Sequence, residues 1–439
     1  MAHDHEEFEV EGARLNTWSN RSGTQSCRPH VVTHPWSLRG LQFEIEAARK
    51  HNQRLRIAGA GHADTALCVT DGRLLTLRNY QGVVSVDRQR YRVRVRGGTS
   101  LGALGKALAD KGLALSGIGG LESQTIAGAV SGGSLATLPT SGLIAKQVTA
   151  FRLLLASGEE IECSRSTHSD IFELGRVNLG ALGIVTELEL QCVPAYNLEL
   201  IAESRPLDEA LAALKTHDAN AGGLTLSWSV HAARAGLVRA TRTQTRADPA
   251  AGHTLPAALA TGVRWLAARF PQQATWWLPE PAPAERRVLA ATDALGRRSL
   301  LPRLRCSCFV PRESLGATVE ALKPLLRRST AATHARLDVT PVIADSLPLS
   351  PAHGGDVYYL RLGANRGADQ LTLFELARQT MTEHGGRPDW AAWPDGDPAA
   401  FDEVADLDAF GCLQARLDPE GLFLNTWLSR LLRRSRGVD

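Results

Sequence analysis

Two glycine-rich stretches about 60 residues apart set the tightest constraint on what this chain folds into. The first is Ala58-Gly59-Ala60-Gly61-His62-Ala63, and the second runs from Ser116 to Gly133 with glycine at six positions. Glycine lets main-chain N–H groups approach a ligand closely, and successive N–H groups form an anion-binding nest without a lysine. The pattern therefore predicts a backbone site for a diphosphate-bearing cofactor.

His62 closes the first stretch, just past a short strand expected at Leu55–Ala58. A histidine between Gly61 and Ala63 is, on these residues alone, an exposed loop residue. The second glycine-rich stretch gives it an alternative role beside a bound cofactor.

Two familiar motifs match only in part. Gly59-Ala60-Gly61 follows a strand as a dinucleotide-binding fingerprint would, but the third glycine is replaced by Asp64. Gly98-Thr99-Ser100-Leu101-Gly102 matches the G-x-S-x-G nucleophile elbow, whose strand should be almost wholly apolar. In the preceding strand, Tyr91, Val93 and Val95 alternate with four arginines, Arg90, Arg92, Arg94 and Arg96. We therefore predict that Ser100 caps a helix beginning at Leu101 and is not a nucleophile.

The length, composition and charge of the chain limit the class of protein and the partners to be expected. The 439 residues predict two domains, and 44% hydrophobic residues suffice for real cores. A net charge of +3 gives no reason to expect nucleic acid, and no apolar run is long enough to cross a membrane. Seven scattered cysteines without a CxxC pair predict no metal site and favour a reducing, cytoplasmic location. The acidic N-terminus has no secretory h-region.

The pattern of expected strands and helices changes at Pro194. Before it, Ile184–Val193 is the clearest strand, with apolar residues on one face and Glu187, Glu189 and Gln191 on the other. After it, a strand followed by a helix recurs three times, which predicts a second domain of the α+β type. The segment Asp248–Pro283 is expected to be a helical excursion, because a flexible linker would not carry three tryptophans.

The ordered motifs resemble the vanillyl-alcohol oxidase/PCMH flavoproteins, in particular their sugar-lactone and alditol oxidase branch. The likeness spans nearly the whole chain in the right order. The residues that carry it are Ala58 to Ala63, Asp71-Gly72, Gly97 to Leu101, Gln124 to Gly133, Gly180 to Thr186, Phe309 to Glu313, Leu349 to Gly354, Gly386 to Trp390, and Asp418 to Asn425.

The resemblance implies an α+β fold with a PCMH-type FAD-binding domain of two α+β subdomains. A substrate domain with an antiparallel sheet flanked by helices follows it. We expect the FAD domain at 1–195, the substrate domain at 196–400, and a C-terminal segment, 401–439, that returns to the FAD domain.

The resemblance also implies the cofactor site. His62 falls where the family attaches the flavin covalently, and Gly119 and Gly120 fall beside the flavin, where small residues keep access open for dioxygen. The other residues implied to hold FAD are Ala58, Gly59, Ala60, Gly61, Ala63, Thr125, Gly128, Gly132, Gly133, Ser134 and Ile184. One departure is Ser134-Leu135-Ala136 in place of the family's Thr-His-Gly.

The substrate side departs further. Alditol oxidases have Glu-x-Arg where this chain has Asp338-Val339-Thr340, threonine where Gly363 stands, and His-Trp-x-Lys at 389–392, where it has Asp-Trp-Ala-Ala. Arg361, on the same strand face as Gly363, is placed to supply the missing cation. Asp338, Arg361 and Asp389 are therefore the candidate catalytic residues. The structural alternatives are a strand-end cap for Asp338 and a surface strand position for Arg361.

The expected function is an FAD-dependent oxidase with flavin bound covalently through His62. It would oxidise a CH–OH or CH–NH group of a small molecule, a modified sugar, cyclitol or biosynthetic intermediate, with dioxygen as acceptor. The alternative from another class is a flavin-binding scaffold with a non-oxidase or non-redox role. A serine hydrolase using Ser100 is the third interpretation.

Overall fold

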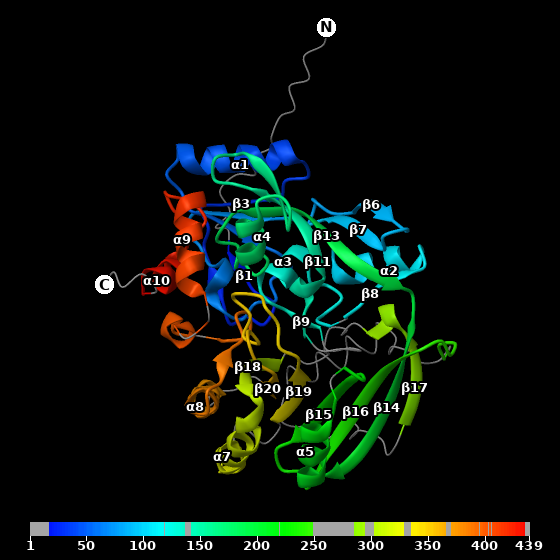
Figure 1. Cartoon of the computed structure of the whole chain (residues 1–439). Coiled ribbons are helices and arrows are strands. Elements are labelled where there is room, and N and C mark those ends of the chain that lie inside the picture. Colours follow the sequence, from blue (N-terminus) through cyan, green and yellow to red (C-terminus); the bar gives the residue numbers. More distant parts are fainter. Residues whose placement is uncertain are drawn as a thin grey trace.

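The structure is a computed structural model of the 439-residue chain. It describes residues 17–117, 119–136, 142–218, 220–248, 285–294, 303–328, 335–365, 370–394, 396–402, 404 and 406–434. Two lobes are evident: an N-terminal lobe in blue to cyan, and a second lobe in green to orange below it (Figure 1).

A small parallel sheet begins the N-terminal lobe, with strand order β3-β5-β4. Helix α1 (Leu38–Lys50) connects β3 to β4 and starts at Ser37, whose side chain accepts a hydrogen bond from the Gly40 amide. The strands are β3 (Val31–Thr33), β4 (Leu55–Ala58) and β5 (Arg73–Thr76), preceded by the hairpin of β1 (Trp18–Ser19) and β2 (Ser26–Cys27).

The second sheet of this lobe is antiparallel, in the order β12-β11-β13-β7-β6, and β8 also pairs with β13. Its strands are β6 (Val83–Asp87), β7 (Arg92–Arg96), β8 (Leu113–Leu115), β11 (Val148–Leu154), β12 (Glu160–Ser164) and β13 (Ile184–Pro194). The helices of this region are α2 (Leu101–Ala109), α3 (Ile126–Ser131) and α4 (Ser169–Gly175), and the two-residue strands β9 (Leu135–Ala136) and β10 (Gly142–Leu143) pair with each other.

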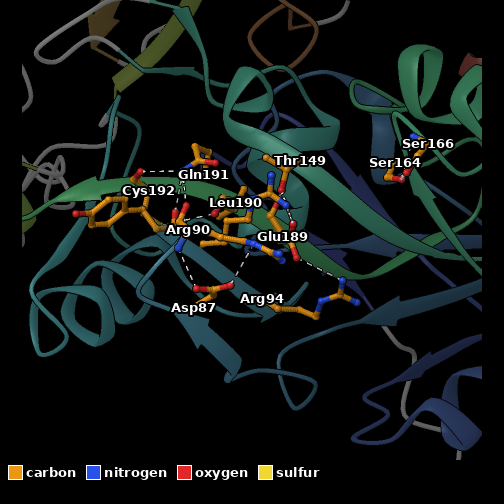
Figure 2. Close-up of polar contacts among 12 residues, drawn as sticks. Asp87, Arg90, Arg94, Thr149, Ser164, Ser166, Glu189, Leu190, Gln191 and Cys192 are labelled. Atoms are coloured by element: carbon orange, nitrogen blue, oxygen red, sulfur yellow. Dashed lines mark hydrogen bonds and ion pairs between the residues drawn. The ribbon is translucent and has the colours of Figure 1, made fainter.

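The two faces predicted for β13 are confirmed. Its apolar positions are buried in the core, whereas Glu187 and Glu189 lie on the polar face with Arg94 of β7. Figure 2 shows Glu189 between Arg94 and Thr149, whose hydroxyl donates to the carboxylate at 2.8 Å. The arginines of β7 therefore belong to a cross-strand ion-pair network.

Ser100 has the capping role predicted for it. Its Oγ accepts a hydrogen bond from the Ala103 amide at 3.1 Å, at the first turn of α2. The strand before it, β7, is antiparallel to both of its neighbours. A nucleophile elbow requires a parallel sheet at this point, so the structure gives no support to the hydrolase interpretation.

The second lobe contains one eight-stranded sheet in the order β17-β14-β16-β15-β19-β20-β18-β21, in which every recorded pairing is antiparallel. Helices α5, α7 and α8 lie on the side away from the N-terminal lobe (Figure 1). The elements are β14 (Asn197–Pro206), α5 (Leu207–Thr216), β15 (Gly223–Ser229), β16 (Arg234–Thr243), β17 (Glu285–Ala290), β18 (Arg303–Pro311), α7 (Leu315–Arg328), β19 (Arg336–Val342), β20 (Val357–Asn365), α8 (Gln370–Glu383) and β21 (Arg387–Pro388).

This lobe has the strand-then-helix units and the antiparallel sheet that were predicted. The excursion expected at Asp248–Pro283 lies outside the described residues, apart from Asp248 itself. Within the described part of the chain, no helix combines the length and apolar character needed to span a membrane, and the seven cysteines form no disulfide.

The C-terminal helices α9 (Leu407–Leu417) and α10 (Thr426–Arg434) lie beside the N-terminal lobe, drawn in red (Figure 1). Helix α9 packs against α4, and Arg416 forms an ion pair with Asp170. The Leu55 amide of β4 donates to the carbonyl of Leu422 at 2.8 Å. The C-terminal segment therefore extends the first lobe.

Arg56 of β4 fastens these segments together. Its side chain is almost completely buried, and its guanidinium donates to the carbonyls of Leu67, Leu179, Gly180 and Phe423. Burial lowers the pKa of Arg56 to about 10, because the charged form loses water. The four carbonyls replace that water.

We expect Arg56→Met to lower the free energy of unfolding by at least about 3 kcal/mol, because it leaves buried carbonyls without donors. Urea denaturation followed by circular dichroism measures the loss. The matched control is Arg90→Met, since the Arg90 side chain is 76% exposed, and its effect should stay within about 0.5 kcal/mol. Equal stability of the two variants would contradict a fastening role for Arg56.

Candidate functional site

A cleft opens in the N-terminal lobe where three backbone segments meet. They are the loop after β4, the first turns of α3, and the residues before and at the start of β13. The cleft is lined by Trp18, Arg56, Ile57, Gly59, Ala60, Gly61, His62, Ala63, Leu67, Cys68, Leu77, Gln124, Thr125, Ala127, Gly128, Ala129, Ser131, Gly132, Ser134, Asn178, Leu179, Gly180, Gly183, Val185 and Ala391.

The glycines of the first loop are sterically required. An added Cβ at Gly59 would lie 2.3 Å from Oγ1 of Thr125, and Gly61 has a φ of +70°. Thr125 in turn caps α3 by accepting a hydrogen bond from the Gly128 amide. The two glycine-rich stretches therefore meet across the cleft.

The lining fits a flavin adenine dinucleotide. Small residues and glycines leave main-chain groups accessible to a diphosphate. Ile57, Leu77 and Val185 provide apolar walls for a flat ring system. Among the described residues, no cluster of histidine, cysteine or carboxylates is arranged to hold a metal ion.

His62 lies in this lining. Its Nε2 is 2.8 Å from Oγ of Ser123, a hydrogen bond whose direction depends on the tautomer. Its carbonyl accepts a hydrogen bond from Nη2 of Arg305, on β18 of the second lobe, at 2.8 Å. Both the ring and the backbone of His62 are thus held in place.

The residues implied to hold FAD divide into two groups. Those that line the cleft are Gly59, Ala60, Gly61, His62, Ala63, Thr125, Gly128, Gly132 and Ser134. Those outside this lining are Ala58, Gly119, Gly120, Gly133 and Ile184. Gly120, with a φ of +75°, lies against the side chain of Gln124, and Ile184 is buried between Gly183 and Val185, which both line the cleft.

Several lining residues were not identified from the sequence. Gln124 and the turn at Gly180–Gly183 lie within motifs that were recognised, so extending those motifs residue by residue would have found them. Ala391 likewise lies within the recognised motif at 389–392, whereas Trp18, Arg56 and Asn178 carry no such signal, because only the tertiary fold brings them to the cleft.

A polar sheet face adjoins the cleft. Alternate residues of β15, β18, β19 and β20 form cross-strand rows on one side of the sheet, which is polar except for the buried Phe309. The rows are Arg305, Gly363 and Arg336; then Ser307, Arg361, Asp338 and Ser227; then Phe309, Tyr359 and Thr340.

Asp338 and Arg361 come together in the second row, with Nη2 of Arg361 2.9 Å from Oδ2 of Asp338. Arg336, which was not identified from the sequence, also pairs with Asp338, Nε to Oδ1, at 2.7 Å. The Ser227 hydroxyl donates to the same carboxylate. Asp338 lies inside β19, so the strand-end cap interpretation was wrong.

Opposing effects act on the pKa of Asp338. Burial raises it, but the charges of Arg361 and Arg336 outweigh burial and hold the pKa below its usual range. A carboxylate with a lowered pKa and this many donors is a poor proton acceptor. Asp338 is better suited to orienting the two arginines.

Asp389 lies apart from this pair. Its carboxylate accepts hydrogen bonds from the Tyr359 hydroxyl at 2.8 Å and from the Ala391 amide at 2.9 Å. Burial raises the pKa of Asp389, and burial followed by the charge of Asp389 raises the pKa of Tyr359. A carboxyl with a raised pKa is the better proton acceptor of the two.

Arg305 joins the sheet face to the cleft. Its Nε is 2.9 Å from Oδ2 of Asp64, only two residues after His62, and the Asp64 side chain is 4% exposed. The Asp64 amide donates to the carbonyl of Ala391, which lines the cleft. The polar face and the His62 loop therefore form one continuous site.

Comparison with known families matches the description "FAD binding domain" to residues 29–164. The description "D-arabinono-1,4-lactone oxidase" matches residues 188–431, more than half of the 439 residues.

Among curated proteins, the L-gulonolactone oxidase of Scyliorhinus torazame is 27% identical over 95% of this chain and 98% of its own length. The L-gulono-1,4-lactone dehydrogenase of Mycobacterium tuberculosis is 28% identical over 94% of this chain and 99% of its own.

Among solved structures, cholesterol oxidase from B. sterolicum has a TM-score of 0.73 at 16% identity, covering 95% of this chain and 96% of its own. The carbohydrate oxidase of Microdochium nivale has a TM-score of 0.71 at 15% identity, covering 93% of each chain. These likenesses confirm the fold predicted from the sequence. The chain belongs to the D-arabinono-1,4-lactone oxidase family, and it is an FAD-dependent oxidoreductase.

Proposed function

We propose that this enzyme oxidises a CH–OH or CH–NH group of a modified sugar, cyclitol or biosynthetic intermediate, with FAD attached through His62 and dioxygen as the acceptor. The carrying observation is the polar face of Arg361, Asp338 and Arg336, which adjoins the cleft through Arg305. Relatives named for oxidising L-gulonolactone or D-arabinono-1,4-lactone support a sugar-like substrate. The division into domains 1–195, 196–400 and 401–439 is part of this proposal.

The cleft residues bind the cofactor. The glycine-rich backbone of both loops would hold the diphosphate, and the apolar walls would hold the ring. When bound, FAD supplies the acceptor for the hydride that leaves the substrate carbon. Gly119 and Gly120, which lie outside the cleft lining, would leave access for dioxygen because they have no side chain.

The polar face would bind and orient the substrate. Arg361, anchored by Asp338, would donate hydrogen bonds to substrate oxygens. Asp389 would accept the proton from the reacting hydroxyl, while Tyr359 holds its carboxylate in place.

The residues of the substrate side do not favour a plain alditol as the substrate. Thr340 is buried and bonded to Thr225, Gly363 has no side chain, and Ala392 is a buried methyl group. None of these three replaces the arginine, threonine and lysine of alditol oxidases. Losing two charge-assisted contacts costs roughly 3 kcal/mol of transition-state stabilisation.

We therefore expect xylitol and sorbitol to reduce the flavin at least about a hundredfold more slowly than the best substrate. The measurement is anaerobic bleaching of the flavin with lactones, alditols, amino sugars, cyclitols and sugar acids. Xylitol matching the best compound would contradict the altered specificity. Failure of every compound to bleach the flavin would favour the scaffold alternative.

Asp389→Asn should slow flavin reduction by about a hundredfold or more, because the amide cannot accept the proton. In the parent enzyme the rate should fall as pH decreases through the raised pKa of Asp389, since protonation removes the base. The variant should lose this pH dependence. Asp208→Asn, at a side chain 88% exposed, is the matched control and should keep both rate and profile.

His62→Ala should release the flavin on denaturation, whereas the unmutated protein should retain one FAD. The flanking Gly61, the hydrogen bond to Ser123 and the place of His62 in the lining support this attachment. Gel fluorescence in acid and intact-protein mass measure it. Circular dichroism should show both proteins folded, and a colourless denatured band from the parent protein would contradict the proposal.

A further inference from the structure

The polar face has no side chain at Gly363, and we call this side-chain-free position the hollow. Cross-strand pairing places Arg305 and Arg336 on either side of it, and Arg361 is two residues along the same strand. An added Cβ at Gly363 would meet only the carbonyl oxygens of Leu304 at 3.9 Å and Arg336 at 4.0 Å. Three arginines of the polar face therefore flank a position without a side chain, and two of them, Arg336 and Arg361, turn their guanidinium groups toward Asp338 in the next row.

Two of these arginines share a single carboxylate. Arg336 pairs with Oδ1 of Asp338 and Arg361 with Oδ2, so one positive charge is in excess. The arginine side chains are 47% and 46% exposed, whereas that of Asp338 is 13% exposed. The excess charge is accessible from the open side of the face.

Arginine N–H groups without a hydrogen-bond partner in the described part of the chain also support a ligand site at this position. The recorded hydrogen bonds of Arg336 and Arg361 come from Nε and Nη2. Nη1 of each has no hydrogen-bond partner among the residues that the structure describes. Each guanidinium has five N–H donors, so both retain capacity for a ligand.

The other charged groups that the structure describes near the hollow do not neutralise the excess positive charge of Arg336 and Arg361. Arg305 is paired with Asp64 at 2.9 Å. Asp389 lies against Tyr359, in the next row of the face. Asp338 is thus the carboxylate that Arg336 and Arg361 both contact.

We propose that this hollow binds the carboxylate of a sugar acid, and that the substrate is therefore anionic. This inference rests on the proposed function and names its substrate class. A carboxylate is planar and accepts paired N–H donors from arginine, and its single charge matches the excess. A neutral lactone or alditol would leave that charge unmatched.

The test compares pairs of sugars that differ by one carboxylate: D-galacturonate with D-galactose, D-glucuronate with D-glucose, and D-gluconate with sorbitol. Isothermal titration calorimetry on the purified holoenzyme measures binding, and anaerobic bleaching measures flavin reduction separately. We expect at least one acid to bind tenfold or more tightly than its neutral partner. Raising the salt concentration should weaken this preference, because the arginines are exposed.

Variants locate the binding site. Arg336→Gln removes the excess charge, and Gly363→Val fills the hollow at a strand position that tolerates valine; each should abolish the preference for the acid. The controls are Arg312→Gln, an exposed arginine paired with Asp356 at 3.2 Å, and Gly355→Val, where an added Cβ meets nothing within 4 Å. Both should keep the preference.

The outcomes separate the two proposals. An acid that binds with charge dependence but does not reduce the flavin supports the hollow and counts against oxidation of that sugar. Neutral sugars that bind and reduce the flavin as well as their acids overturn the carboxylate site and leave the oxidase proposal standing. A preference that survives both Arg336→Gln and Gly363→Val also overturns it.

Discussion

The buried guanidinium of Arg56 is the contact on which the N-terminal lobe depends. It reaches Leu67, the turn at Leu179 and Gly180, and Phe423, so segments more than 350 residues apart share one donor group. Burying a charge without a carboxylate is costly, and four carbonyls offset that cost only if all of them are in place. The cleft, which Arg56 also lines, is therefore assembled together with the C-terminal segment.

Much of this lobe could be predicted from the sequence, because its signals are local. The alternation in β13, the Ser100 cap and the glycines of the first loop each depend on neighbouring residues. The two glycine-rich stretches come into contact at Gly59 and Thr125, and the diphosphate site that they predict stays a prediction.

The polar face was harder to predict, because its ion pairs depend on the register between neighbouring strands. Arg361 was recognised from its spacing to Gly363, but Arg336 became relevant only when β19 and β20 were aligned. The pair of Asp64 and Arg305 spans 241 residues and has no local pattern. Likewise, the raised pKa of Asp389 comes from burial that the sequence does not encode locally.

The ion pair between Arg305 and Asp64 has a mechanical consequence. Because Arg305 also donates to the carbonyl of His62, the eight-stranded sheet and the His62 loop are joined by a short crosslink as well as by the long chain between them. The spacing between β18 and the His62 loop is thereby fixed at one point. Gly363 and Arg336 make no contact in this crosslink, so a change of side chain at either position leaves the link between the two lobes intact.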